Sequence, residues 1–342
     1  ATGIDTIAIG EKSVAQGVNS TAVGTLAQAL DDDALAAGVR AKASAKFSTA
    51  LGNQSTAEKV FDLAVGYDSV ASGEQSTAVG FKAKSTAFAS NAIGGSSLAE
   101  GEFSTAVGQE SYTDKKATQA LAVGYRSNAF GEQSTAVGFQ SRSEGYASNA
   151  IGSSSLAKGD HSTAIGTSSA AEGGFSIAIG QQSKTAAGQN FATALGFQSN
   201  ASGYASFAQG FTAEASGAGS IAIGDKSKAT NNDTIAIGTK AEATGFRAIS
   251  IGKSNNVSGY KSAAIGNDNK FTTDNTFVVG RNVTKTLENS VFLGAEAAYT
   301  TKGASTDGDA AVTEPVTVGG KLTYGGFAGK TPVGVVSVGD VG

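Results

Sequence analysis

The sequence predicts an all-β protein built as a solenoid, in which short coils of two parallel strands stack on one another. A pentapeptide related to Ser-Thr-Ala-Val-Gly recurs along the chain, and its last residue, the closing glycine, marks each coil from Gly10 to Gly294. Of the twenty intervals between these glycines, eighteen are 14 residues long and two are 16. A fixed short period is typical of a solenoid, whose units pack only on their neighbours. We therefore expect one repetitive rod followed by a tail.

Small residues occupy alternate positions on both predicted strands. Counted from the closing glycine, position −2 is Ala in 18 of 21 coils, and position −4 is small in every coil except the one with Asp62. Positions +3 and +5 hold only Ala, Ser or Thr in the first seventeen coils. Side chains alternate between the faces of a strand, so these positions form two faces that meet inside a narrow coil. The enclosed Ser hydroxyls are expected to bond to backbone groups or to each other.

Two turns per coil are predicted from glycine. The closing glycines mark one turn, and glycines at position +7, such as Gly17 and Gly145, mark the other. Glycine adopts positive φ without strain, which is the expected reason for its place at both turns.

The outward faces of the two strands differ in polarity. Position −1 is Ile, Val or Leu in 19 of 21 coils, whereas positions +4 and +6 include charged residues such as Lys42, Arg142 and Glu242. Burying each aliphatic side chain contributes about 1.5–3 kcal/mol, so we expect chains to associate through this stripe. Cyclic symmetry satisfies this requirement with two, three or more chains. The predicted core stripe consists of Ile9, Val23, Leu51, Val65, Val79, Ile93, Val107, Val123, Val137, Ile151, Ile165, Ile179, Leu195, Ile223, Ile237, Ile251 and Ile265.

Composition excludes several classes of function. The chain has no Cys, so disulfides, thiol nucleophiles and Cys-based metal sites are impossible. Its net charge of −4 argues against a nucleic-acid partner. No signal peptide or membrane-spanning apolar run is visible, and we expect a piece excised from a longer protein. Uniform coils with small interiors leave no pocket, so we expect neither an enzyme nor a cofactor.

The repeat resembles the YadA-like head repeat of trimeric autotransporter adhesins, whose consensus contains Asn-Ser-Val-Ala-Ile-Gly. Residues 220–229 read Ser-Ile-Ala-Ile-Gly-Asp-Lys-Ser-Lys-Ala, and residues 19–24 read Asn-Ser-Thr-Ala-Val-Gly. The resemblance extends over about residues 4–294. It implies a left-handed parallel β-roll and a homotrimer.

The same resemblance implies a function. It indicates the adhesive head of a bacterial surface fibre, held at the outer membrane through a C-terminal β-barrel that this sequence does not contain. Expected targets are host matrix proteins (collagen, fibronectin or laminin), host cells, abiotic surfaces or other bacteria. Attachment is expected through many weak contacts on the polar face and the turns, strengthened by threefold repetition.

The rhythm of the coils breaks after Gly294. We expect residues 1–294 to form the head repeats and residues 295–342 a head insert, similar to the segment before the neck in this family. A β-hairpin is predicted to turn at Gly319 and Gly320. Val336-Ser337-Val338-Gly339 then resumes the coil pattern as a final coil that leads toward an absent neck.

Four features of the sequence are candidates for special sites. His161, the only histidine, is interpreted as a turn or surface residue because its slot is variable. The run Asp31-Asp32-Asp33 could hold a hard cation, but a solvated turn is favoured. Six aromatic residues that follow closing glycines form either an exposed ladder or, as favoured, a cover over a coil edge or a neighbouring chain: Tyr67, Phe81, Tyr125, Phe139, Phe197 and Phe211.

The fourth feature is the pair of 16-residue intervals, at 109–124 and 181–196. They are interpreted as surface bulges, either ligand contacts or, as favoured, tolerated loop insertions. The sequence Gln-Ser-Thr-Ala-Val-Gly-Phe at 75–81 recurs at 133–139, so a block of four coils plus two residues was duplicated.

Two other functional classes compete with adhesion. A structural spacer within the fibre is the plainest alternative. An ice- or mineral-binding solenoid requires a regular ladder of one residue, and the Thr residues at position −3 come closest. That column is interrupted by Ile7, Leu35, Asn91, Asn149 and Phe207, and it lies on the face assigned to the axis.

Overall fold

A computed structural model describes residues 1–299 and the backbone of 336–338. The described chain is all-β and contains no helix. It divides into two compact units, Ala1–Phe191 and Ala192–Gly342, each described here by itself. The predicted boundary at residue 294 stays a prediction, because most of 295–342, including the hairpin expected at Gly319 and Gly320, lies outside the described residues.

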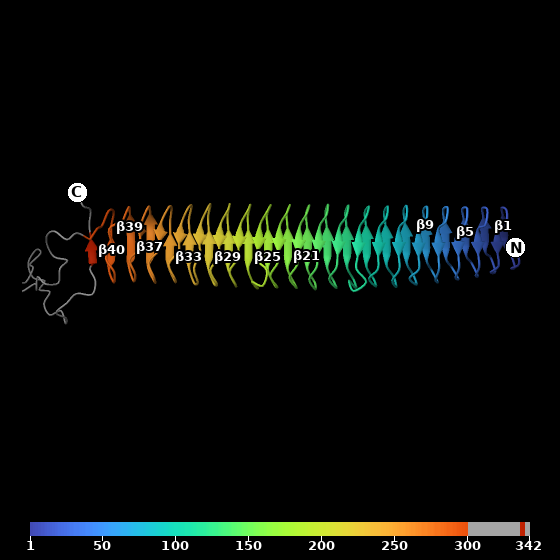
Figure 1. The fold of residues 1–342 in the computed structure, drawn as a ribbon, viewed down its shortest axis with the longest axis horizontal. Helices are drawn as coiled ribbons and strands as arrows, with labels where there is room; N and C mark the ends of the chain where they lie inside the picture. The colour runs from blue at the N-terminus through green and yellow to red at the C-terminus, as the bar shows by residue number, and fades with distance from the viewer. Residues whose placement is uncertain (300–335, 339–342) are drawn as a thin grey trace, which may run out of the picture. The chain divides into compact units, whose positions relative to one another are not determined.

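Most coils contain a three-residue strand that ends at position −1 and a two-residue strand at positions +4 and +5, whereas β37 and β39 have five residues. In each unit the longer strands form a parallel sheet, sheet A, and the shorter strands form a second, sheet B. Figure 1 shows the coils of each unit stacked in sequence order. This arrangement confirms the predicted parallel β-solenoid of 14-residue coils.

Sheet A of the first unit contains β1 (Ile7–Ile9), β3 (Thr21–Val23), β5 (Leu35–Ala37), β7 (Thr49–Leu51), β9 (Leu63–Val65), β11 (Thr77–Val79), β13 (Asn91–Ile93), β15 (Thr105–Val107), β17 (Leu121–Val123), β19 (Thr135–Val137), β21 (Asn149–Ile151), β23 (Thr163–Ile165) and β25 (Ile177–Ile179). Its sheet B contains β2 (Val14–Ala15), β4 (Gln28–Ala29), β6 (Lys42–Ala43), β8 (Thr56–Ala57), β10 (Val70–Ala71), β12 (Lys84–Ser85), β14 (Leu98–Ala99), β16 (Tyr112–Thr113), β18 (Asn128–Ala129), β20 (Arg142–Ser143), β22 (Leu156–Ala157), β24 (Ala170–Ala171) and β26 (Lys184–Thr185).

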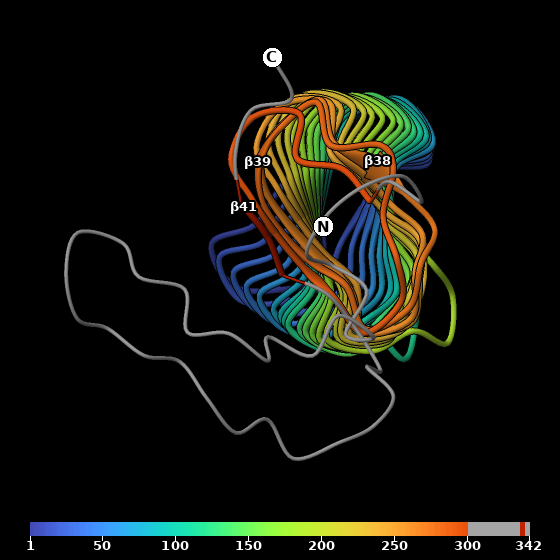
Figure 2. The same cartoon turned by 90° about the vertical axis from the view of Figure 1, so that its left-hand side faces the viewer.

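Sheet A of the second unit contains β27 (Thr193–Leu195), β29 (Phe207–Gln209), β31 (Ile221–Ile223), β33 (Ile235–Ile237), β35 (Ile249–Ile251), β37 (Ala263–Asn267), β39 (Phe277–Arg281), β40 (Val291–Leu293) and β41 (Val336–Val338). Its sheet B contains β28 (Asn200–Ala201), β30 (Glu214–Ala215), β32 (Lys228–Ala229), β34 (Glu242–Ala243), β36 (Asn256–Val257) and β38 (Lys270–Phe271). Seen along the coils, β39 and β41 lie on one side and β38 on the other (Figure 2).

The register follows the sequence period. Ala8 pairs with Ala22, one period further along the chain. Across the first 16-residue interval the register is kept, because Thr105 pairs with Leu121. Strand β41 pairs in parallel with β40, with Val291 opposite Val336. The backbone therefore returns to sheet A 45 residues after Val291.

The interior is as narrow as the alternation predicts. Ala residues at positions −2 and +5, among them Ala22 and Ala29, have no exposed surface. Buried Ser hydroxyls donate to backbone carbonyls at the turns, as Ser55 Oγ does to the Gly52 oxygen at 2.9 Å. Others pair across the coil, as Ser85 Oγ and Ser90 Oγ do at 2.6 Å. The expected satisfaction of these hydroxyls is confirmed for most coils, although Ser20, Ser44, Ser134 and Ser162 have no hydrogen-bond partner for Oγ.

The interior changes character in the last coils of the second unit. Larger side chains are buried there, namely Val257, Phe271, Val278, Val283 and Phe292. Terminal repeats of a solenoid are commonly atypical in this way, because they cap the array.

Two buried asparagines form a ladder in the same coils. Asn255 Oδ1 accepts hydrogen bonds from the backbone N–H and from Nδ2 of Asn269, both at 3.0 Å. Asn269 Oδ1 in turn accepts from the Val283 N–H at 3.0 Å. The sequence analysis missed this ladder, although two Asn residues at position +3 in successive coils were a visible signal.

The glycine prediction is correct for one turn and wrong for the other. The closing glycines other than Gly280 have positive φ, for example 136° at Gly138. The glycines at +7 do not, and in that turn the left-handed conformation is adopted by the residue at position −5, such as Phe47 (59°). At Gly145 the requirement is space, because a Cβ there would lie 2.2 Å from the carbonyl oxygen of Gly159 in the next coil.

Candidate functional site

The predicted apolar stripe lies on the outer face of sheet A. Sixteen of its residues occupy the last position of a sheet A strand, Ile265 lies in the middle of β37, and none of the seventeen is buried within the isolated chain. Ile9 is 59% exposed, and Ile93 and Ile265 are each 40% exposed. The intervening Ala residues point inward and are fully buried. Each unit therefore presents a row of aliphatic side chains that its own fold does not cover.

The outer face of sheet B is polar and carries ion pairs between neighbouring positions. Arg142 Nε lies 2.5 Å from Glu144 Oε1, and Lys184 Nζ lies 3.5 Å from Glu172 Oε1. The Arg and Lys side chains are about half exposed to water and the two Glu side chains about a quarter, so each pair contributes little to stability. The two sheets thus differ in polarity as predicted.

A phenol bridges two acidic residues on this polar face. Tyr112 Oη donates toward Glu100 Oε2 and Asp114 Oδ2, each at 3.0 Å. Burial and these two carboxylates raise the pKa of the Tyr112 phenol well above its usual 10. The phenol remains protonated at physiological pH, so it acts here as a donor that holds two carboxylates together.

Aromatic rings stack along both turn edges of the coils. After closing glycines, Tyr67 and Phe81 stack with ring centroids 5.5 Å apart, and Tyr125 and Phe139 at 5.4 Å. In the second unit Phe197 stacks on Phe211 at 5.2 Å. The six aromatic residues singled out in the sequence therefore form three stacked pairs.

The opposite turn edge carries a second set of rings that the sequence analysis missed. Phe47 stacks on Phe61 at 5.1 Å, and Phe88 meets Phe103 edge to face at 5.2 Å. The signal was obscured because these rings occupy two different slots, positions −6 and −5.

His161 belongs to this second set. Its ring stacks on Phe175 at 4.7 Å and meets Tyr146 edge to face at 5.2 Å. Phe175 continues to Phe191 at 5.3 Å. The residue lies exposed in a turn, as predicted, and its neighbours are aromatic rather than catalytic.

The aspartate run makes local hydrogen bonds. Asp32 Oδ1 accepts from the Val18 N–H at 3.0 Å, and Asp33 Oδ1 accepts from Asn19 Nδ2 at 3.2 Å. Asp31 Oδ1 accepts from the Asp32 N–H at 2.8 Å. The carboxylates thus join adjacent turns. Within residues 1–299, no group of three His, Cys, Asp or Glu side chains could hold a metal ion.

The two bulges are short loops between sheet B and the next strand of sheet A. In the first, the Ala117 N–H donates to the Asp114 carbonyl at 2.8 Å, and Ala117 is buried. In the second, the Gln189 N–H donates to the Ala186 carbonyl at 3.2 Å, and Gly188 adopts a φ of 72°. Each loop is closed by its own backbone.

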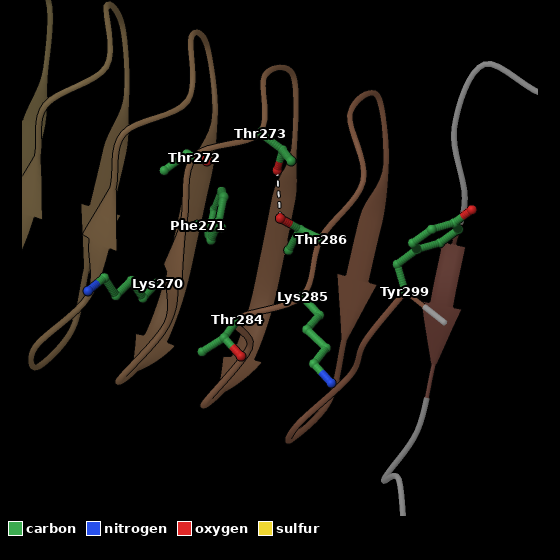
Figure 3. A pocket seen from close by; sticks show the side chains of 8 residues that line it. All are labelled: Lys270, Phe271, Thr272, Thr273, Thr284, Lys285, Thr286 and Tyr299. Carbon is green, nitrogen blue, oxygen red and sulfur yellow. Dashed lines mark hydrogen bonds between the residues drawn. The ribbon is translucent and has the colours of Figure 1, made fainter. Parts of the chain in front are cut away.

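A shallow hollow of about 550 Å³ lies in the last coils of the second unit (Figure 3). The Oγ1 atoms of Thr273 and Thr286 are 2.6 Å apart at one side, and Tyr299 stands at the other. The remaining lining residues are Lys270, Phe271, Thr272, Thr284 and Lys285. These described lining residues include no acid–base pair.

The comparisons with known proteins identify the array. The family model described as "YadA head domain repeat (2 copies)" matches residues 1–27, 32–55, 57–83, 85–111, 116–141, 144–169, 157–183, 186–213, 215–241 and 243–269. The chain belongs to the YadA head family. This YadA-like head is therefore an array of adhesin head repeats, as the resemblance predicted.

One solved structure is similar to the YadA-like head over part of its length. It is the crystal structure of the collagen-binding domain of the Yersinia adhesin YadA, at 23% sequence identity and a TM-score of 0.19. The alignment covers 48% of this chain and 65% of that one, so this head spans about two thirds of the structure it matches. No curated protein matches the chain. Among the described residues, no helix has the length and apolarity needed to cross a membrane.

Proposed function

We propose that this YadA-like head is the adhesive part of a homotrimeric fibre displayed on the bacterial surface. The observation that carries the proposal is the succession of ten matched head-repeat segments. The expected targets are collagen, fibronectin or laminin, host cells, other bacteria, and abiotic surfaces. Collagen is the first ligand to test.

The homotrimer part of the proposal rests on the uncovered stripe. A row of partly or fully exposed Ile, Val and Leu side chains lies along each unit, and soluble monomers rarely leave a continuous apolar row in water. Cyclic symmetry with sheet A toward the axis covers this row and leaves the polar face of sheet B in water. Three copies of a repetitive polar face then allow weak contacts to add.

Sedimentation equilibrium tests the assembly before any ligand is tried. We expect a mass near three times 33.7 kDa. The matched variants are Val107→Lys, which places a charge in the stripe, and Leu98→Lys, which places it at the outward position of β14 in sheet B. Val107→Lys should dissociate the trimer more strongly than Leu98→Lys, because only the first charge faces the proposed axis. A folded, soluble wild-type monomer contradicts the trimer.

Binding is then measured on surfaces coated with collagen, fibronectin or laminin and on bare polystyrene. Trimeric head should bind at least one of them, and the Val107→Lys monomer should bind with much lower apparent affinity, because the contacts no longer add. Trimeric head that binds none of these surfaces favours the spacer role.

We also infer that the head acts by binding rather than by catalysis. The support is the narrow Ala and Ser interior of the coils, which leaves no enclosed space for a substrate. An ice-binding role is tested by thermal hysteresis, and we expect no activity because the Thr column of sheet A is interrupted and faces the proposed axis.

A further inference from the structure

The rings on the two turn edges of the first unit occupy different coils. For this comparison, coil n runs from position −6 to position +7 around the nth closing glycine, so coil 1 contains Gly10 and coil 13 contains Gly180. The closing edge consists of the two residues after each closing glycine. The return edge consists of positions −6 and −5, where the chain turns from sheet B back to sheet A.

Rings on the return edge come in three groups separated by gaps. They lie in coils 4 and 5, in coils 7 and 8, and in coils 11–14, as Phe47, Phe61, Phe88, Phe103, Tyr146, His161, Phe175 and Phe191. The gaps are coil 6, which holds Glu74 and Gln75, and coils 9 and 10, which hold Gln119 and Gln133.

Rings on the closing edge lie where the return edge has none. Phe81 is in coil 6, and Tyr125 and Phe139 are in coils 9 and 10. Both edges carry a ring in coil 5, with Tyr67 and Phe61, and in coil 14, with Phe197 and Phe191. Every coil from 4 to 14 thus has a ring on at least one of its two edges. No single ring extends from one edge of a coil to the other.

We propose that the two edges meet between neighbouring chains, so that the closing-edge rings of one chain fill the gaps in the return-edge ladder of the next. The proposal rests on the cyclic homotrimer proposed above. When sheet A of every chain faces a common axis, rotation about that axis places the closing edge of one chain beside the return edge of its neighbour at the same height. The aromatic groups then join into one column along each seam.

The rings need such a cover. Phe61, Phe81 and Phe103 are 55%, 55% and 53% exposed in the isolated chain. The planes of Phe47 and Phe61 are within 3° of parallel, and those of Tyr67 and Phe81 within 12°. Stacking therefore uses the faces of these rings and leaves their edges open. Edges of one ring pack well against faces or edges of another.

Charges on the two edges are complementary in two of these coils. Coil 6 carries Lys82 on the closing edge and Glu74 on the return edge, and coil 3 carries Arg40 and Asp33 in the same way. Among the contacts of the described chain, none of these four side chains has a partner of opposite charge. Asp33 accepts a hydrogen bond only from Asn19. Opposite charges at one height favour the in-step register over a shifted one.

Coil 8 is the exception, because Glu110 and Glu102 have the same sign. Glu110 is neutralised within its own chain by Arg126, whose Nε lies 2.5 Å from Glu110 Oε2. The like charges therefore weaken the seam at that height without preventing it.

Site-directed cross-linking tests the seam directly, because the chain has no native Cys. The test variant carries Glu74→Cys and Lys82→Cys together and is treated with a short bismaleimide. Within one chain these positions lie beyond opposite ends of β11, about 20 Å apart, so a bridge inside the chain is disfavoured. We expect covalent dimers and trimers on a denaturing gel, with three chains as the largest product.

Three controls define the result. Each single variant should remain monomeric on the gel, because the three copies of one position lie at different seams. A mixture of the two single variants, unfolded and refolded together, should give dimers. The offset pair Lys82→Cys with Asp160→Cys, six coils apart, should not cross-link.

Sedimentation separates failure of the seam from failure of the trimer. A variant that sediments as a trimer but does not cross-link overturns the seam and leaves the trimer intact. A variant and wild type that both sediment as monomers overturn the trimer and the seam with it. Equal cross-linking by the offset pair overturns the in-step register.

Discussion

Asp62 accepts two hydrogen bonds from one residue of the next coil, because its Oδ1 lies 2.9 Å from both the backbone nitrogen and the Oγ of Ser76. Its other oxygen, Oδ2, accepts from the Lys59 N–H at 2.8 Å. Asp62 is 1% exposed, in a position that holds a small residue in every other coil. A carboxylate thus replaces a hydroxyl inside an Ala and Ser interior.

The first prediction concerns the pH dependence of stability. Burial raises the pKa of the Asp62 carboxyl above its usual 3.8, and the hydrogen bonds from Ser76 and Lys59 offset only part of that increase. A carboxyl with a raised folded pKa stabilises the fold below its unfolded pKa, and this contribution is lost as pH rises through the folded value. Asp62→Ser should therefore raise the melting temperature at pH 7 by about 2–4 °C, for a gain of about 1 kcal/mol.

Thermal unfolding at pH 4 and pH 7 checks this prediction. The difference between Asp62→Ser and wild type should shrink as pH falls toward 4, because the raised pKa of the wild-type carboxyl favours its protonation as pH falls. Asp68→Ser, at a partly exposed turn, serves as the control for general surface charge. A destabilised Asp62→Ser at pH 7 shows that the carboxylate bonds outweigh its desolvation.

The second prediction concerns the closing glycines. Gly138 has a φ of 136°, and a Cβ there would lie 2.5 Å from the Gly152 carbonyl oxygen. Gly138→Ala should destabilise the first unit by about 1–3 kcal/mol through backbone strain, with the clash added. Gly95 is the matched control, because its only neighbour within 4 Å is Gln109 Cγ at 3.9 Å. Denaturant unfolding should show little change for Gly95→Ala, and equal losses for both variants contradict the argument.

The third prediction concerns the width of the coil. Ala78 is fully buried between the two sheets, whereas Thr77 points outward in the same strand. Ala78→Val should lower stability by about 1–3 kcal/mol, because overpacking forces the neighbours apart. Thr77→Val should change it by much less. A neutral Ala78→Val, measured by thermal unfolding, indicates a more compliant interior than the structure shows.

The fourth prediction concerns the asparagine ladder. Asn269→Ala removes the acceptor of the buried Val283 N–H and a donor to the Gly280 carbonyl, which it reaches at 3.0 Å. Each buried polar group left unpaired costs about 1–3 kcal/mol. The melting temperature of the second unit should fall, and hydrogen exchange at Val283 should accelerate. Asn256→Ala, at the outward position of the adjacent strand, should leave Val283 protected.

Much of the fold follows from the sequence because each residue repeats its environment once per coil. The alternation that places Ala22 inside and Val23 outside is a property of any strand, and the 14-residue period extends it to every coil. The polarity of the two outer faces follows for the same reason. These local rules can be applied without knowing which residues are in contact.

Contacts between coils were decided only by the tertiary structure. Tyr146 lies at position −6 of one coil and His161 at position −5 of the next. Their rings meet because successive turns are stacked one coil spacing apart. Glycine is required at position 145 because the Gly159 carbonyl approaches it closely, and not because of its own φ. No pattern along the chain distinguishes these two reasons for a glycine. The sequence by itself determined the period, the inside and the outside. The stacked structure decided which rings, amides and carbonyls become neighbours, because those distances depend on how each turn sets one coil on the next.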